Sequence, residues 1–327
     1  MIGPFPTPPN GRRRVGRAVW SFWSRPFQAR HHQVWASEKH HLLAWILSVE
    51  TARQHYPETA LVTDQAGAAL LVEGLGLAFD HVSTELDALE AADPDWWVLG
   101  KLCAYRAQTE PFVHLDSDVF LWKRLPDPMN TAPVLAQNSE HFPFVGSWYR
   151  PEAFDVAVRA TRGWLPPEWT WYVAQRWGEA LCCGILGGTD IGFINHYADT
   201  AVKIIEHPAN QTAWRLLGFK IGDNILFEQY FLSACVAYHA HREASPFHGV
   251  YAHCLFGSAG DAFNPDRAAE AGYTHLIGGA KQNEALAARL EARVARDYPR
   301  HYRRCLDFVA GRRRHAQAMA ATETRPA

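Results

Sequence analysis

The strongest constraint on the fold is an alternation of strand-like and helix-like segments in the first half of the chain. Short apolar runs, which are typical of buried strands, are separated by segments with the apolar spacing of helices. Strands are expected at 18–23, 60–63, 79–82 and 112–115, and helices from Ser37, at 64–75 and at 96–109. This β-α-β-α-β-α-β order predicts an α/β fold, with a Rossmann-like, mostly parallel sheet flanked by helices.

The second half is less regular. It contains a strand-like run at 133–137, an aromatic-rich segment at 166–177, helical patterns at 189–205 and 224–238, a last strand at 273–276 and a long C-terminal helix at 283–309. No Ser/Gly-rich linker and no repeat separates the halves. We therefore expect one large domain over residues 16–310. The Pro-rich residues 1–15 and the Arg/Ala/Thr-rich residues 311–327 are expected to be flexible tails.

Composition excludes several classes of protein. Apolar residues make up 48% and charged residues 20% of the 327 residues, which excludes a disordered, collagen-like or coiled-coil chain. The 32 basic and 34 acidic residues give a net charge of −2, so a nucleic-acid partner is not expected. No apolar stretch is long enough for a transmembrane segment. Residues 1–10 lack a signal-peptide core, and the six cysteines form no CxxC pair, which together favour the cytoplasm and free thiols.

Two aspartates stand at the end of the fourth expected strand, in Asp116-Ser117-Asp118. In parallel sheets ligands bind beyond the carboxyl ends of the strands. Carboxylates at positions i and i+2 can converge on one Mg²⁺ or Mn²⁺ ion, which can then hold a diphosphate. A pair of exposed turn aspartates is the alternative, but the apolar residues 112–115 and 119–122 on both sides make unpaired acids costly here.

A second group of functional residue types lies near the C-terminal end, at His275-x-x-Gly278-Gly279-x-Lys281. The imidazole of His275 can supply a nitrogen ligand to a manganese-like ion, although most of the 17 histidines of the chain need no such role. Gly278 and Gly279 allow the backbone to approach a phosphate closely. Lys281 can place its ammonium on the same phosphates.

A lysine on the helix before the aspartates completes the pattern. Lys101, followed by Leu102, could reach back to the carboxyl edge of the sheet, or it could be an ordinary solvated helix lysine. A lysine-leucine helix, an apolar strand with DxD and a late HxxGxxK together resemble the glycogenin-like retaining glycosyltransferases of the GT-A fold. Over most of residues 20–302 the chain also resembles an uncharacterised bacterial family of suggested glycosyltransferases.

The resemblance implies a metal and a donor substrate. It implies that Asp116, Asp118 and His275 bind Mn²⁺ or Mg²⁺, with Asp116 bridging the metal and the ribose. It also implies that Lys101 and Lys281 contact a nucleoside diphosphate sugar, with a UDP-sugar as the expected donor. The acceptor, which could be a glycan, a peptide or a small molecule, is not indicated, because the family's Asn-x-Gly element and its Pro-Trp after the late lysine are replaced here.

Three residues are candidates for the catalytic face. Retaining transfer needs a group near the sugar face away from the leaving diphosphate. Glu228-Gln229 stands where the resemblance places the family's Asp-Gln element, and Asp190 follows two glycines at the start of an expected helix. A solvated helix acid is the alternative for Glu228, and an N-cap is the alternative for Asp190. We rank Glu228 and Gln229 above Asp190.

The sequence also contains histidine pairs and many tryptophans, which are less specific signals. The pairs His31-His32 and His40-His41 and the motif His239-x-His241 lack the spacing of zinc motifs and are assigned to surface or packing roles. The following tryptophans could stack on a sugar or fill an aromatic core: Trp96, Trp97, Trp148, Trp164, Trp169, Trp171 and Trp177. We expect a metal-dependent, hexosyltransferase-like glycosyltransferase. The alternatives are a non-catalytic sugar-nucleotide or glycan binder and, less favoured, a metal-dependent nucleotidyltransferase.

Overall fold

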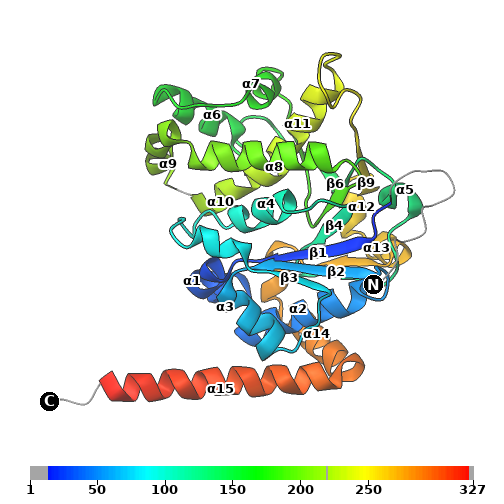
Figure 1. Ribbon diagram of the computed structural model, residues 1–327, viewed down its shortest axis with the longest axis vertical. Coiled ribbons are helices and arrows are strands. Elements are labelled where there is room, and N and C mark those ends of the chain that lie inside the picture. Colours follow the sequence, from blue (N-terminus) through cyan, green and yellow to red (C-terminus); the bar gives the residue numbers. More distant parts are fainter. Residues whose placement is uncertain (1–13, 219, 324–327) are drawn as a thin grey trace.

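The computed structural model describes residues 14–218 and 220–323, and these residues form a mixed sheet between two layers of helices (Figure 1). The strands are β1 (Arg17–Phe22), β2 (Glu58–Thr63), β3 (His81–Ser83), β4 (Phe112–Leu115), β5 (Val119–Leu121), β6 (Val134–His141), β7 (Glu179–Leu181), β8 (Ile185–Gly188), β9 (Ala252–Phe256) and β10 (Tyr273–His275). Among the described residues, eight strands form the central sheet in the order β3-β2-β1-β4-β8-β6-β7, with β9 paired to β6. β5 and β10 form a separate two-stranded sheet.

The directions of the strands divide the sheet into two parts. β1 is parallel to β2 and β4, and β2 is parallel to β3, which confirms the parallel sheet predicted for the first half of the chain. β8 is antiparallel to both β4 and β6, and β7 is antiparallel to β6, whereas β9 is parallel to β6. The chain is thus a single α/β domain whose sheet is mixed.

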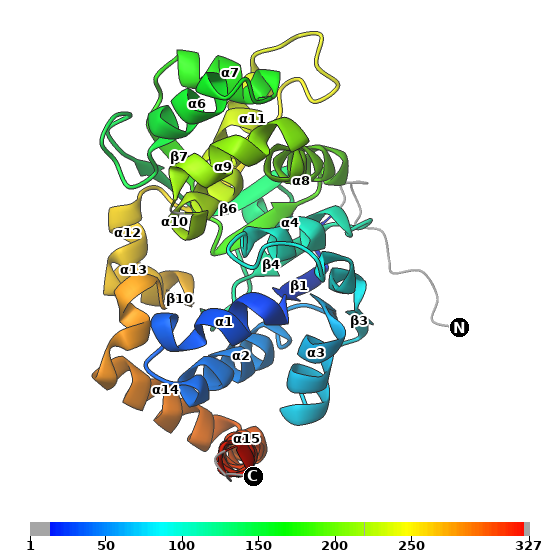
Figure 2. The same cartoon turned by 90° about the vertical axis from the view of Figure 1, so that its left-hand side faces the viewer.

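The helices cover both faces of the sheet (Figures 1 and 2). They are α1 (Ser24–Val34), α2 (Glu38–Ala52), α3 (Gln65–Ala68), α4 (Val98–Arg106), α5 (Asp127–Asn130), α6 (Pro151–Ala160), α7 (Pro167–Ala174), α8 (Ile191–Glu206), α9 (Gln211–Leu217), α10 (Lys220–Ile225), α11 (Phe231–Ala240), α12 (Ala259–Phe263), α13 (Pro265–Ala271), α14 (Glu284–Asp297) and α15 (Pro299–Glu323). Short 3-10 or π segments are η1 (Ala69–Gly74), η2 (Glu85–Leu89), η3 (Pro208–Asn210), η4 (Leu226–Tyr230) and η5 (Gly278–Gln282). Helices α4, α8 and α11 lie on one side of the sheet, and α1, α2 and α14 on the other.

The side chains of β1 show why the sheet is covered on both faces. Ala18, Trp20 and Phe22 are buried in the core on the α2 side, and Val19 is buried in the core on the α4 side. Successive side chains of a strand point to opposite faces, so a strand with buried apolar side chains on both faces needs a helix layer on each. The strand is therefore rigidly held, and the chain that leaves its carboxyl end is well positioned.

The C-terminal region corrects two expectations. The predicted helix at 283–309 is two helices, because Pro299 lacks an N–H and disfavours helical backbone at Tyr298, which has φ −132° and ψ 56°. The second helix, α15, runs past Gly311 to Glu323, so most of the expected tail at 311–327 is helical rather than irregular. A compositional boundary at Gly311 was therefore the wrong place to end the helix.

The N-terminal boundary also shifts. Residues 1–13 of the expected tail at 1–15 lie outside the described residues. Val15 is fully buried, and its N–H donates to the carbonyl of Asn130 at 2.8 Å, so packed structure begins inside the expected tail. All six cysteines are free, as expected. Within the described ranges, no helix has both the length and the apolar character that crossing a membrane requires.

Candidate functional site

The Asp116-Ser117-Asp118 turn follows β4 directly, beyond the carboxyl end of a strand in the middle of the sheet. The N–H of Val119 donates to the carbonyl of Asp116 at 3.0 Å and closes the turn. The N–H of Asp116 donates to the carbonyl of Gly184, also at 3.0 Å, which ties the turn to the start of β8. Both aspartates therefore stand on backbone that is fixed on two sides.

The pairing of β5 with β10 brings His275 to the turn. His275 lies opposite Val119 in this antiparallel pair, and the N–H of Leu276 donates to the carbonyl of Asp118 at 3.0 Å. Ligand atoms of Asp116, Asp118 and His275 all lie within 4.8 Å of one another. The structure thus brings together the three residues that the sequence predicts as metal ligands, and we call them the cleft cluster.

The ring of His275 is oriented by residues that the sequence analysis did not identify. Its Nδ1 lies 2.7 Å from Oε1 of Gln137, which also accepts a hydrogen bond from the Tyr273 hydroxyl at 2.6 Å. Because the amide oxygen can only accept, Nδ1 is the donor in this hydrogen bond, and Nε2 is the nitrogen that faces Asp118, 3.6 Å from its Oδ1. Gly184 completes this support, since a Cβ there would lie 2.6 Å from Nδ1 of His275.

Lys101 points to the sheet edge and is not a solvated helix lysine. Its Nζ lies 2.7 Å from Asp116 Oδ1 and forms a second ion pair with the carboxylate of Glu228. Burial opposes the charge of this ammonium, but the two carboxylates outweigh that effect and raise the pKa of Lys101. The side chain is therefore a fixed positive charge between two acids.

Lys281 makes the matching contact on the other aspartate. Its Nζ lies 2.6 Å from Oδ2 of the buried Asp118. Burial favours the neutral form of this carboxyl, but the positive charges of Lys281 and His275 outweigh burial and hold the pKa of Asp118 far below its usual range. Gly278, three residues before the lysine, has φ +54°, a left-handed conformation that favours glycine.

Glu228 and Gln229 lie in η4, a π-helical segment between α10 and α11. Such segments often occur at functional sites. Glu228 is 1% exposed, so it is not the solvated helix acid of the alternative interpretation, and it accepts a hydrogen bond from the Tyr105 hydroxyl at 3.0 Å. Burial, opposed by Lys101, raises the pKa of Glu228. Gln229 accepts a hydrogen bond from Tyr149.

Asp190 is not brought to this group. Its carboxylate accepts the N–H of Phe193 at 3.0 Å and caps α8, which is the alternative role expected from its position. β8 runs antiparallel to β4, so Ile185 lies opposite Leu115 near the cleft cluster whereas Gly188 lies opposite Phe112 at the other end of the strand. Asp190 therefore follows the strand at the sheet edge remote from Asp116. The structure thus separates Asp190 from Glu228, which shares Lys101 with Asp116.

Two cavities meet at the cleft cluster. The first, of about 400 Å³, lies beyond β1 and has largely aromatic walls. The second, of about 600 Å³, lies on the η4 side and is lined by Glu140, Glu228 and Gln229 among others. Both are lined by Trp97, Lys101, Asp116 and Lys281. A molecule with an aromatic part and a polar part could therefore extend from one cavity to the other across the acidic turn.

The aromatic residues divide between the cavities and the core. His41 and Trp35, whose rings stack at 5.3 Å, line the first cavity, and Trp148, which is 62% exposed, lines the second. Trp96 and Trp169 are buried core residues. The core role is thus confirmed for Trp96 and Trp169, and stacking on a sugar stays a prediction for Trp97 and Trp148. The side chains of His31 and His32 lie outside the described residues.

Several residues of the second cavity could not be found from sequence patterns. Tyr149 contacts both Glu140, at 2.9 Å, and Gln229. Glu140 is at the end of β6 and Tyr149 is in the loop that follows, so their approach depends on tertiary structure. An acid beyond the strand-like run at 133–137 is the one signal that could have pointed to Glu140.

Comparison with known proteins places the chain in a family without assigning it a function. No curated protein matches the chain. The model of a family described as of unknown function, DUF6734, matches residues 16–308, which include every residue of the cleft cluster and of both cavities. The chain therefore belongs to DUF6734, a family of unknown function.

Proposed function

We propose that this protein is a metal-dependent glycosyltransferase of the GT-A type, which moves a sugar from a nucleoside diphosphate sugar to an acceptor with retention of configuration. The observation that carries the proposal is the position of the cleft cluster, with Lys281 beside it, at the junction of an aromatic and a polar cavity. A nucleoside diphosphate sugar has the same three parts in order: an aromatic base, a diphosphate and a polar ring.

The donor set of the cleft cluster fits a hard divalent cation. Two carboxylates and one imidazole suit Mn²⁺ or Mg²⁺, and the bond of Nδ1 to Gln137 leaves Nε2 of His275 as the nitrogen that would bind the ion. Asp116, Asp118 and His275 would hold the ion, which when bound would supply positive charge to the leaving diphosphate.

The first cavity suits the nucleoside. Its walls include the side chains of Phe22, Trp23, Trp35 and Trp45, from β1, from α2 and from the segments that follow β1 and α1. Aromatic faces stack on nucleobases at a gain of about 1–3 kcal/mol per base in single-stranded nucleic-acid complexes. The aromatic wall and the carboxyl end of β1 support a base and ribose here, which is where doubly wound sheets bind nucleotides.

The second cavity suits the sugar and the acceptor. Glu228 is held by the Tyr105 hydroxyl and by Lys101, and Gln229 by Tyr149, so both side chains are fixed before any ligand binds. A fixed carboxylate beside the sugar would stabilise positive charge that develops on the ring in the transition state. Glu228 is the residue we propose for that role, with Gln229 positioning the sugar.

Lys281 would balance charge on the donor. Its ammonium lies against Asp118, and both Lys281 and Gly278 line the second cavity. The side chain can exchange this carboxylate for a phosphate oxygen with little movement. A lysine placed this way stabilises the charge that grows on the diphosphate as the glycosidic bond breaks.

The proposal is tested by incubating the purified chain with a panel of nucleoside diphosphate sugars and Mn²⁺, followed by mass spectrometry. Hydrolysis of one donor identifies its base and sugar together. We expect Asp118→Ala to abolish metal-dependent binding of the nucleoside diphosphate in calorimetry. Glu228→Gln should retain that binding and lose turnover. Asp190→Asn is the matched control and should retain both.

Three results would distinguish the proposed glycosyltransferase from the alternatives. Absence of Mn²⁺-dependent nucleoside diphosphate binding by the wild-type chain, for every base tested, would overturn the proposal. Unchanged affinity in Asp118→Ala would overturn the site assignment. Binding without turnover of any donor, in the presence of glycan, peptide and small-molecule acceptors, would instead support a non-catalytic sugar-nucleotide binder.

A further inference from the structure

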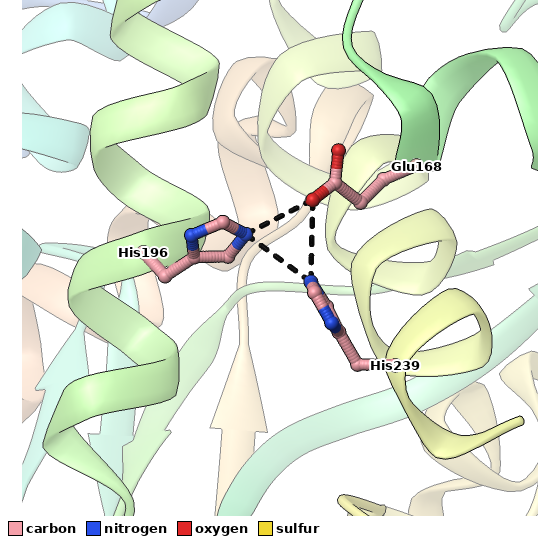
Figure 3. Close-up of side chains that lie close together, drawn as sticks. All are labelled: Glu168, His196 and His239. Atoms are coloured by element: carbon pink, nitrogen blue, oxygen red, sulfur yellow. Dashed lines mark hydrogen bonds and ion pairs between the residues drawn. The ribbon is translucent and has the colours of Figure 1, made fainter. Parts of the chain in front are cut away.

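A second group of metal-ligand side chains lies in the helix layer away from the cleft cluster (Figure 3). Glu168 comes from α7, His196 from α8 and His239 from α11. The distances are 3.0 Å from Glu168 Oε1 to Nε2 of His196, 3.2 Å from Oε1 to Nε2 of His239 and 3.1 Å between the two Nε2 atoms. We call these three residues the helix cluster.

The triangle of these three atoms has the size of one face of a metal coordination shell. Ligand atoms about 2.0–2.1 Å from a tetrahedral zinc ion are about 3.3 Å apart. The observed edges of 3.0, 3.1 and 3.2 Å are close to that value. In the cleft cluster, Nε2 of His275 and Oδ1 of Asp118 are farther apart, at 3.6 Å.

The surroundings of the helix cluster support a ligand as well. Nδ1 of His239 lies 2.7 Å from the hydroxyl of Ser245, a second-sphere contact that can hold Nε2 in the lone-pair form. Oε2 of Glu168 is buried and takes no hydrogen bond from any other described residue, although the residue is only 4% exposed. A buried carboxylate oxygen without a partner is costly. Figure 3 shows this oxygen turned away from both histidines, so an ion on the three facing atoms would satisfy it only if Glu168 bound through both of its oxygens.

One side of the helix cluster is closed and one is open. The ring of Phe247 lies 5.3 Å from the rings of both histidines, and Phe193 lies 6.0 Å from His239, which gives an apolar wall. The side chain of His196 is 34% exposed, so water can reach the ion from that side. Three protein ligands and one open position form a recognised zinc arrangement.

We propose that Glu168, His196 and His239 bind a transition-metal ion, Zn²⁺ in the first place, that joins α7, α8 and α11. Two imidazoles and one carboxylate favour a borderline ion such as zinc over the hard Mn²⁺ or Mg²⁺ proposed for the cleft. His239 is therefore a ligand, and not the surface or packing residue expected from the sequence.

The ion would hold together the helices whose side chains support η4, which lines the second cavity. Tyr197, next to His196, donates its hydroxyl to the carbonyl of Glu228 at 2.6 Å, and Trp169, next to Glu168, packs its ring 5.4 Å from that of Tyr230. Both contacts reach η4. Fastening α7, α8 and α11 to one another therefore supports the backbone that carries Glu228.

The test is metal uptake by the chelator-stripped full chain. The Asp118→Ala variant is used so that the cleft cluster contributes no site. We expect it to take up about one Zn²⁺ per chain in elemental analysis, with a higher midpoint of thermal unfolding. Co²⁺ should give the intense visible absorption of a four-coordinate site. Glu168→Gln and His239→Asn in the same background should lose both signals, while His241→Asn, the matched control, should keep them.

Two outcomes overturn the proposal. One is zinc uptake that is unchanged in Glu168→Gln and His239→Asn, which would place the ion elsewhere. The other is no zinc or cobalt uptake by the Asp118→Ala chain, in which case two imidazole N–H groups donating to Glu168 explain the short distances. The cobalt measurement needs no change in the helix cluster, so it decides the matter even if those variants fail to fold.

Discussion

The cleft cluster and the helix cluster both combine carboxylates with imidazoles, in opposite proportion. Asp116, Asp118 and His275 stand at a strand end, beside two lysines and two cavities. The helix cluster has two histidines and one carboxylate, with a serine hydroxyl and phenylalanine rings as neighbours. Carboxylate-rich ligands beside exchangeable lysines suit a cation that is shared with a phosphate substrate, whereas an imidazole-rich site among helices suits a resident transition-metal ion.

The largest difference between the two clusters should appear in anion binding, and Lys281→Ala measures it. Loss of a desolvated contact to a diphosphate costs about 2–5 kcal/mol, which corresponds to roughly thirtyfold to several thousandfold in affinity. Calorimetry should show this loss for the nucleoside diphosphate and little change for the free nucleoside. Lys203→Ala, on α8 with its ammonium 4.7 Å from the Trp164 ring, is the control and should change neither. Equal losses for both ligands would mean that Lys281 only supports the fold.

Gly184→Ala should affect the cleft cluster and spare the helix cluster. The new methyl would lie 2.6 Å from Nδ1 of His275 and would displace the ring from Gln137. Such overpacking costs about 1–3 kcal/mol of stability, and loss of second-sphere support lowers metal affinity roughly 10–100-fold. Mn²⁺ affinity and the free energy of unfolding should both fall, with zinc uptake unchanged.

Gly279→Ala is the matched control for that substitution. Apart from its two chain neighbours, no described residue has an atom within 4 Å of a Cβ built at Gly279, so Mn²⁺ affinity and stability should stay near those of the wild type. If Gly184→Ala behaves like this control, His275 does not depend on the contact, and its orientation has another cause.

The cleft cluster could be predicted because its residues lie in short motifs beside recognisable strands. Asp116 and Asp118 directly follow β4, and His275 ends β10, so each is marked by the apolar run before it. The pairing that joins them, with His275 opposite Val119, is a long-range contact that no local pattern reveals. The resemblance to a known family supplied that link.

The supporting residues and the helix cluster could not be predicted for a physical reason. Gln137 and Gly184 act through contacts with His275, and nothing in their own sequence surroundings marks them. Glu168, His196 and His239 come from three helices and share no motif spacing. By contrast, the break at Pro299 was visible in the sequence, since proline disfavours helical backbone in the residue before it.

The smallest expected effect is on the pH dependence of stability, to which two carboxyl groups of the cleft, Asp118 and Glu228, contribute in opposite directions. The pKa of Asp118 is lowered, so its contribution to stability is present above its ordinary pKa and is lost as the pH falls through the lowered value. The pKa of Glu228 is raised, chiefly by burial, so the folded state holds a proton that the unfolded state has released. Stability from this group therefore falls as the pH rises from about 4.5 through the raised pKa.

Glu228→Gln removes the dependence of stability on pH that comes from Glu228. It keeps the shape of the side chain and an acceptor for the Tyr105 hydroxyl. Lys101 remains paired with Asp116. In urea unfolding at a series of pH values, the stability of the variant relative to the wild type should increase as the pH rises above about 4.5. The change should be on the order of 1 kcal/mol, the size of an ordinary substitution effect. All other titrating groups are shared by the two proteins, so the difference isolates Glu228. A difference that shrinks with rising pH would mean that Lys101 dominates and that the carboxylate of Glu228 is ionised throughout, which would favour it as a permanently charged group facing the sugar.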